Sequence, residues 1–473
     1  MLSDAKRSVL WSGVQHVSIY GLQLLITLFI ARLISPEDYG IIAMTVVFFS
    51  IAQAIIDFGM EGALIQRKHC SREDYSTAFW FSLIMSFVFY AVFFFLAGRI
   101  AGYFNIPPLE KVIRISSLVL ILRASGIVPY SILQRDLNFK GIAKIAALVT
   151  IISGATAVFL AYKGLAYWAL VVQTMMSALF MTVLYYAVSG WGPSLTFSRK
   201  SIKELLGFGL PMMLTSLVNS VYSNLYSLVI GKRFSDRQLG LFNRGSTFSG
   251  YVPCNLSDFS LRALYPIFSK YQDDLPQLRF QALKTLRLTV FVAVPINLFL
   301  MANATDIVLI VLKDKWLDMV PIIRILCVSH LSYLACNIHI NLLKSINRTD
   351  RLLWCELLKK AIGIGILAIT IPMGIIPMMW GILAYSFINI LVGTFFVKKS
   401  VGVTVWDQVK SGLPLSVLAA AAVLAGYFAA SPIDNIYARV SISGILSAGL
   451  YLGVCCLVRD QSVKFFLNYF RRN

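Results

Sequence analysis

The chain has 473 residues, of which 58% are hydrophobic and only 14% charged, and its mean hydropathy is +0.76. A soluble domain is closer to a quarter charged, so this composition excludes a water-soluble globular protein and predicts lipid as the main solvent. The net charge of +20 comes from basic residues that lie singly between apolar runs, which excludes a nucleic-acid-binding surface.

Apolar runs of about 20 residues are long enough to cross a bilayer as helices. We predict an all-α membrane protein with about fourteen such spans, and connecting segments too short to fold as a separate catalytic domain. The expected ranges are 9–34, 39–64, 76–101, 110–133, 143–163, 165–188, 204–231, 238–268, 283–304, 318–343, 353–372, 375–397, 412–430 and 437–458.

The first two spans carry the first polar candidates. Gln15 and Gln23 lie along one side of the first span and are expected to line a hydrophilic cavity. Asp57 and Glu61 are four residues apart, so a continuous helix over 39–64 places them on one face. They are candidates for binding a coupling ion, a proton or sodium, and the alternative is a structural role in hydrogen bonding between helices.

Later spans carry arginines at membrane depth. Such a charge costs about 2.5–3.5 kcal/mol at mid-helix unless it faces water or an acid. Guanidinium groups bind phosphate oxygens in pairs, so a cationic substrate cavity is the functional interpretation, and snorkelling or packing is the alternative. The four candidates are Arg123, Arg244, Arg262 and Arg324.

Two further groups lie in the spans 204–231 and 238–268. Asn219, Tyr222 and Tyr226 follow helical spacing and are expected to line the cavity, where hydroxyl, amide and aromatic groups suit a sugar. Interhelical hydrogen bonding is the alternative. Asp258 lies four residues before Arg262, which favours a charge-neutralising structural pair over ion coupling.

The segment Ile30–Gly40 resembles Ile230–Gly240, and Asp57–Gly62 resembles Asp258–Ala263. Because the copies are separated by six predicted helices, an even number, they indicate parallel repeats related by an axis along the membrane normal. We expect two six-helix lobes, 1–200 and 201–400, around a central cavity, followed by two additional helices and a tail in 401–473.

Lys and Arg are far more frequent on the connections that face one side of the membrane if the chain starts in the cytoplasm. By the positive-inside rule, we expect both termini to be cytoplasmic. The seven cysteines form no C-x-x-C pair, the four histidines are scattered, and no P-loop, G-x-S-x-G or H-E-x-x-H motif occurs. We therefore expect no catalytic residue, no metal and no cofactor, and a protein that is not an enzyme.

Six segments together resemble one family. They are IARLISPEDYGIIAMTVVFFSIAQAIIDFGMEGALIQRK, SILQRDLNFK, LGLFNRGSTF, LYPIFSKYQ, KDKWLDMVPIIRIL and INRTDRLLWCELLKKAIGI. In this order and spacing they are similar to bacterial polysaccharide flippases of the Wzx/WzxC type, which belong to the multidrug/oligosaccharidyl-lipid/polysaccharide exporter superfamily.

The resemblance implies a flippase of the bacterial inner membrane with two lobes around a cationic cavity. It would move undecaprenyl-pyrophosphate-linked oligosaccharide repeat units from the cytoplasmic to the periplasmic leaflet by alternating access, for O-antigen of lipopolysaccharide, capsule or exopolysaccharide. The implied partners are this lipid-linked oligosaccharide and the bilayer, together with a polysaccharide polymerase and a chain-length regulator. The family has no strict catalytic signature, so the site residues above rest on depth and charge.

Four alternatives stay open at this point. A lipid-linked peptidoglycan-precursor flippase differs in substrate only, and a drug or small-solute exporter of the same superfamily is expected to have twelve helices and a more acidic cavity. From another class, a membrane polysaccharide polymerase needs a large catalytic loop, for which the chain has little room. A non-transporting scaffold leaves the charges in the spans without a role.

Overall fold

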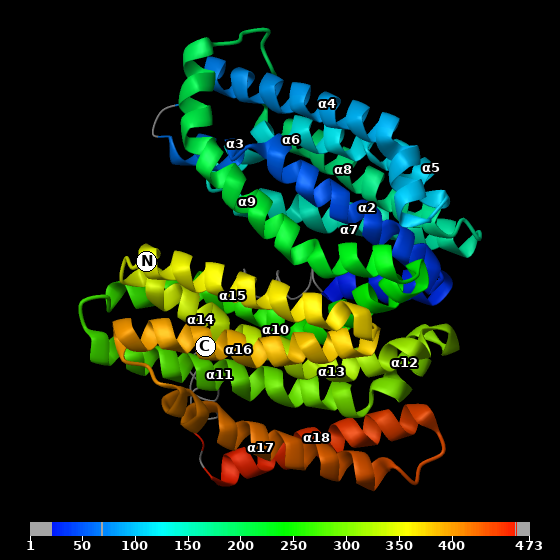
Figure 1. Ribbon diagram of the computed structural model, residues 1–473, viewed down its shortest axis with the longest axis vertical. Coiled ribbons are helices and arrows are strands. Elements are labelled where there is room, and N and C mark those ends of the chain that lie inside the picture. The colour runs from blue at the N-terminus through cyan, green and yellow to red at the C-terminus, as the bar shows by residue number, and fades with distance from the viewer. Residues whose placement is uncertain (1–20, 68–69, 459, 461–473) are drawn as a thin grey trace. The chain divides into compact units, whose positions relative to one another are not determined.

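The computed structural model describes residues 21–67, 70–458 and 460, and every regular element within them is a helix (Figure 1). Side chains are described throughout these ranges except at 258–267 and 349. Eleven helical segments in the described ranges are long and apolar enough to cross a membrane. The prediction of an all-α, multi-pass membrane protein is therefore confirmed.

The predicted count of fourteen spans is not confirmed, because three of the expected ranges are absent from that set of eleven. The first, 9–34, lies partly outside the described residues and is represented by a shorter apolar helix, Gly21–Leu33. The ranges 238–268 and 353–372 do form long helices. Both helices carry several charged residues, which lowers their hydropathy.

The described chain divides into two compact units, Met1–Gly240 and Leu241–Asn473. In the first unit, α8 packs on α6 and α7, while α9 lies along α2, α3 and α4 (Figure 1). The helices of this unit after Gly21–Leu33 are α2 (Pro36–Asp57), α3 (Met60–Gln66), α4 (Arg72–Phe104), α5 (Pro108–Ser116), α6 (Leu118–Arg135), α7 (Phe139–Tyr162), α8 (Tyr167–Ser189) and α9 (Arg199–Arg233).

Helix α9 begins five residues before its predicted range because Ser198 caps it, accepting a hydrogen bond from the backbone of Ser201. Although the repeat assigns α9 to the second predicted lobe, the helix packs with the elements that precede it. The lobes 1–200 and 201–400 with the addition 401–473 rest on the repeat and stay a prediction.

The second unit contains α17 and α18, which pack against each other and, through α17, on α11. Helix α18 is also tied to α12, since the Arg439 guanidinium donates two hydrogen bonds of 2.6 Å to the Asp306 carboxylate. The elements are α10 (Asp236–Lys270, which begins in the first unit), α11 (Leu275–Ala302), α12 (Ala304–Leu312), η1 (Asp314–Met319), α13 (Val320–His330), α14 (Ser332–Ser345), α15 (Thr349–Thr370), η2 (Ile371–Met373), α16 (Ile375–Val401), α17 (Val405–Ala430) and α18 (Ile436–Leu457).

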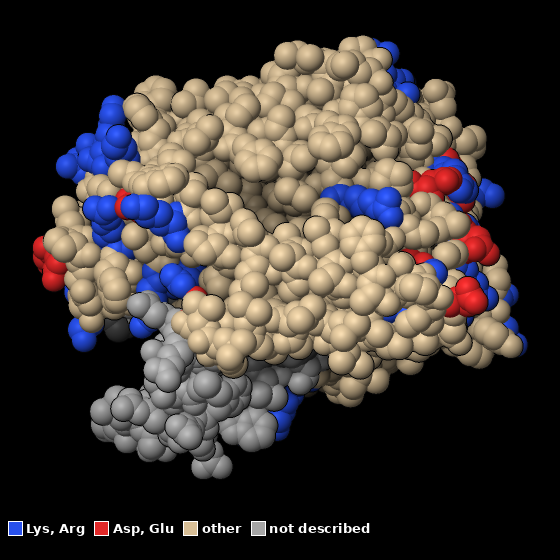
Figure 2. Space-filling view, turned by 90° about the horizontal axis from the view of Figure 1, so that it is seen from below, with Lys and Arg blue, Asp and Glu red and all other residues tan. Residues whose placement is uncertain are grey.

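Charged side chains are sparse on one face of the protein. On the face that Figure 2 shows, most of the surface is uncharged. An uncharged surface suits contact with the hydrocarbon core of a bilayer.

Candidate functional site

The second predicted span is interrupted at its acidic residues. Helix α2 ends at Asp57, and α3 begins at Met60 after two residues in the left-handed region, Phe58 (φ 46°) and Gly59 (φ 69°). The expectation that Asp57 and Glu61 share a face of one continuous helix is therefore wrong. Gly59 permits the break, because a glycine has no Cβ to clash at positive φ.

The break nevertheless keeps the two acids together. The Glu61 backbone N–H donates to Asp57 Oδ1 over 3.4 Å, and Gln134 Nε2 of α6 donates to Glu61 Oε1 over 3.2 Å. Both carboxylates are half-buried, and neither forms an ion pair within the described part of the chain. Interrupted helices with exposed polar groups at membrane depth are used by transporters to build ion and substrate sites.

Helix α9 carries the predicted polar side chains of the span 204–231. Asn219 is exposed, whereas Tyr222 and Tyr226 are half-buried. A residue that the sequence analysis missed, Asn224, reaches α2, where its Nδ2 donates to Ser50 Oγ over 2.9 Å. Asn224 lies in the same run of serines and tyrosines, so its polarity was visible in the sequence, but its contact with α2 was not.

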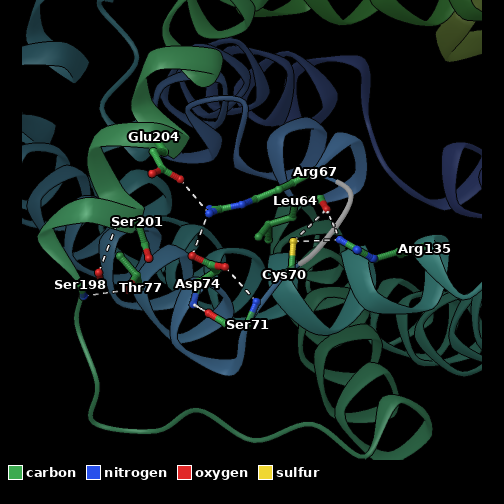
Figure 3. Close-up of polar contacts among 10 residues, drawn as sticks. All are labelled: Leu64, Arg67, Cys70, Ser71, Asp74, Thr77, Arg135, Ser198, Ser201 and Glu204. Atoms are coloured by element: carbon green, nitrogen blue, oxygen red, sulfur yellow. Dashed lines mark hydrogen bonds and ion pairs between the residues drawn. The ribbon is translucent and has the colours of Figure 1, made fainter.

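One end of α9 is held by a basic residue that follows α3 (Figure 3). Arg67 Nη2 lies 2.7 Å from Glu204 Oε2 of α9, and its Nη1 lies 3.0 Å from Asp74 Oδ1 of α4. Asp74 also completes a capping box with Ser71, which fixes the start of α4. This three-way ionic contact ties the start of α9 to α4, at the end that is cytoplasmic by the positive-inside prediction.

The other end of α9 brings the two copies of the sequence repeat into contact. Glu37 Oε1 accepts from Arg237 Nη1 over 2.8 Å. The backbones approach so closely that a Cβ on Gly40 would lie 1.9 Å from the carbonyl O of Asp236. The reciprocal contact is equally tight, since a Cβ on Gly240 would lie 1.8 Å from the carbonyl O of Pro36.

The predicted cationic residues are distributed over both units. Arg123 of α6 is exposed and forms no hydrogen bond or ion pair within the described part of the chain. In the other unit, Arg244 of α10 is half-buried, and exposed Arg324 of α13 donates from Nη2 to Thr305 Oγ1 over 3.2 Å. The Arg262 side chain lies outside the described set, so a shared cavity of these four residues stays a prediction.

For the three remaining predicted residues, the structure shows few or no contacts. Gln23 is exposed on the helix Gly21–Leu33. Gln15 and the Asp258 side chain lie outside the described set. Among the described residues, no group of three or more His, Cys, Asp and Glu side chains is placed to hold a metal ion.

Two histidines join buried hydrogen bonds in the second unit. His339 Nε2 lies 3.0 Å from Gln408 Oε1, and Gln408 Nε2 donates to Thr394 Oγ1 over 2.8 Å. His330 Nδ1 lies 3.0 Å from Ser249 Oγ. These contacts link α14 to α16 and α17, and α13 to α10, so they agree with a packing role.

Solved structures give the fold relationship. The chain is similar to a structure titled "Lipid II flippase MurJ, inward closed conformation", with a TM-score of 0.76 and 17% identity over 95% of this chain and 98% of that one. It is also similar to an inward-facing multidrug resistance MATE family transporter of the MOP superfamily, with a TM-score of 0.61 and 15% identity over 82% of this chain and 98% of that one. At these identities the likeness shows a common transporter fold.

Curated relatives extend over most of the sequence. The chain is 27% identical over 398 residues to the lipopolysaccharide biosynthesis protein WzxC of Escherichia coli (strain K12), covering 83% of this chain and 80% of that protein. It is 26% identical over 363 residues to the succinoglycan biosynthesis transport protein ExoT of Rhizobium meliloti (strain 1021), covering 76% and 73%. Residues 29–321, more than half of the chain, match the family described as polysaccharide biosynthesis protein. This chain therefore belongs to the polysaccharide biosynthesis protein family.

Proposed function

We propose that this protein is a flippase that moves lipid-linked oligosaccharide units across the bacterial cytoplasmic membrane for surface polysaccharide synthesis. The observation that carries the proposal is the family match over 29–321, together with relatives named for lipopolysaccharide biosynthesis and succinoglycan transport. The MurJ-like fold supports a flippase architecture. We infer a transporter and not an enzyme, with both termini cytoplasmic.

The chemistry of the substrate fits the polar residues of the two units. An undecaprenyl pyrophosphate carries negative charge, which the guanidinium of Arg123 can bind without first giving up a partner in the described chain. Arg244, Arg262 and Arg324 would add positive charge, and Gln15, Gln23, Asn219, Tyr222 and Tyr226 would contact the glycan. The lipid tail would remain in hydrocarbon, because its transfer into a polar cavity is unfavourable.

Alternating access would use the two ends of α9. We propose that the Glu37–Arg237 contact and the reciprocal glycines close one end, and that the Arg67–Glu204 contact closes the other. Because tightly packed backbone contacts have discrete arrangements, one of these ends must separate before a bulky glycan can pass along α9. We propose that Asp57 and Glu61, at the break between α2 and α3, bind the coupling proton or sodium ion.

A cellular experiment tests the flippase assignment. The gene is deleted from its host, and surface polysaccharide and lipid-linked intermediates are measured after complementation with wild type, Arg123→Ala or the matched control Arg99→Ala, whose arginine is also exposed. We expect loss of polymer and accumulation of lipid-linked units on the cytoplasmic leaflet, restored by wild type and by Arg99→Ala but not by Arg123→Ala.

The same experiment separates the rival functions. Lipid-linked units that reach the outer leaflet but stay unpolymerised would overturn the proposal and favour a polymerase or scaffold. If instead the deletion leaves polysaccharide intact and cells accumulate the lipid-linked peptidoglycan precursor, the substrate assignment is wrong and the transport class is kept. If the deletion changes neither the surface polysaccharide nor the level of either lipid-linked precursor, the family's function is not supported for this chain.

A further inference from the structure

An apolar groove of about 690 Å³ runs between the helix Gly21–Leu33 and α7 in the first unit. On the first helix it is lined by Leu22, Ile26, Phe29 and Leu33, whose spacing of four, three and four residues places them on one helical face. This groove takes no part in the proposed transport route along α9.

Helix α7 supplies a matching stripe. Ile151, Ala155, Val158 and Tyr162 line the groove with the same helical spacing. The two helices touch beneath it at Gly154, where a Cβ would lie 2.4 Å from Ile26 Cδ1. Glycine, which has no Cβ, permits this close approach of the Ile26 side chain.

Among the described residues that line the groove, the basic group lies at one end and forms a basic rim there. Arg32 lines it, is exposed, and forms no hydrogen bond or ion pair within the described part of the chain. Lys163 follows the last groove residue of α7, and its Nζ lies 5.7 Å from the ring centroid of Phe159, another lining residue. No acidic side chain lines the groove in the described chain, so this rim complements an anion.

The length of the groove indicates what kind of anionic molecule it fits. The first and last residues of each stripe are eleven positions apart, which corresponds to a length of about 17 Å at a helical rise of 1.5 Å per residue. Half of a bilayer's hydrocarbon core is about 15 Å thick, so the groove matches one leaflet. A lipid whose chains end at the midplane fills it, whereas most of a much longer polyprenyl chain would extend beyond it.

We propose that this groove binds one anionic phospholipid, with an acyl chain between the helix Gly21–Leu33 and α7 and its phosphate at Arg32. By the positive-inside prediction, the basic rim lies at the outer face, so the lipid belongs to the outer leaflet of the cytoplasmic membrane. This lipid site goes beyond the proposed function. The class of the bound lipid and the position of the groove do not depend on which substrate the protein transports.

Native mass spectrometry of the full-length protein in detergent tests this site, with phosphatidylglycerol, phosphatidylethanolamine and undecaprenyl phosphate as separate probes. We expect one phosphatidylglycerol to be retained in preference to the other two. Arg32→Gln should weaken its retention about fivefold, which corresponds to about 1 kcal/mol for one basic residue at a membrane surface. Arg32→Lys should keep most of it.

Two further variants serve as controls for the position of the bound lipid. Ala155 is exposed in the groove, so Ala155→Trp should fill it without disturbing the core and abolish retention. Arg99→Gln removes another exposed arginine, one that does not line the groove, and should change nothing. Equal retention of the two phospholipids, or an unchanged Arg32→Gln, would overturn the site. Preferential retention of undecaprenyl phosphate would overturn the phospholipid assignment and give the groove to the transported lipid.

Discussion

Gly40 and Gly240 occupy equivalent places in the sequence repeat and pack against each other's helix starts. Gly40 lies against the carbonyl of Asp236, and Gly240 lies against the carbonyl of Pro36. Both helix starts are capped by the repeated serine, since Ser35 Oγ accepts from the Asp38 backbone and Ser235 Oγ from the Gln238 backbone. The repeat is therefore visible in local structure as well as in sequence.

Replacement of Gly240 by alanine should disturb this contact. The added Cβ would lie 1.8 Å from the Pro36 carbonyl O, so backbone must shift, at a cost of about 1–3 kcal/mol. We expect a lower thermal midpoint of the purified protein and reduced polymer in the complemented deletion strain. Gly449→Ala is the matched control, because nothing lies within 4 Å of its added Cβ. Equal effects of the two substitutions would contradict the steric argument.

The two arms of the Arg67 contact should differ in strength. Glu204→Gln removes a partner whose side chain is 46% exposed, so we expect a loss of about 0.2–1 kcal/mol. Arg67→Gln also leaves the Asp74 carboxylate, 5% exposed, without its ionic partner, at a cost of roughly 1–3 kcal/mol. Thermal unfolding of the single and double variants measures the loss of stability that each substitution causes. A larger loss for Glu204→Gln than for Arg67→Gln would be inconsistent with this geometry.

Glu61→Gln tests the proposed coupling role. The substitution keeps an oxygen that can accept from Gln134, so the fold should be retained while the charge is lost. In proteoliposomes we expect transport that no longer responds to an imposed proton or sodium gradient. Glu110→Gln serves as the control, since Glu110 pairs with Arg114 four residues along the chain. Undiminished gradient-driven transport by Glu61→Gln would remove Glu61 from the coupling site.

Gln408 should be a stability determinant of the second unit. Gln408→Leu deletes the hydrogen bonds to His339 and Thr394 and leaves the buried His339 Nε2 without a partner, at a cost of about 1–3 kcal/mol. Thermal unfolding should show the loss. Thr156→Val should cost little, because the Thr156 hydroxyl donates only to the Ile152 carbonyl of its own helix. A Gln408→Leu protein as stable as wild type would contradict this role for Gln408.

Much of the fold followed from apolar run length, because a helix buried in lipid must be continuously apolar. The predicted span 437–458 and the observed helix Ile436–Leu457 agree to within one residue at each end. The interruption at Phe58 and Gly59 could not be found in this way, since apolar residues continue on both sides of it. The clue is local, a glycine directly after Asp57 and Phe58, and a single glycine occurs in many unbroken helices.

The candidate site was less accessible to sequence reasoning. Depth and charge identified Arg123 as a candidate. The predicted ends of the span, however, do not indicate toward which side of α6 its side chain points. The repeat identified Gly40 and Gly240 as equivalent positions without indicating that they touch. Arg67 and Glu204 are separated by 137 residues, and Arg67 lies outside the predicted spans while Glu204 is the first residue of one, so neither was expected at membrane depth.

The reciprocal glycine contact has a consequence for how this sequence can change. A contact in which position 36 meets 240 while 236 meets 40 is the pattern of a self-complementary interface between two copies of one chain. Here both copies are joined in a single polypeptide, so they are free to diverge. A bulkier residue at position 40 can then be accommodated only by a change near position 236, and the two halves must covary at this point.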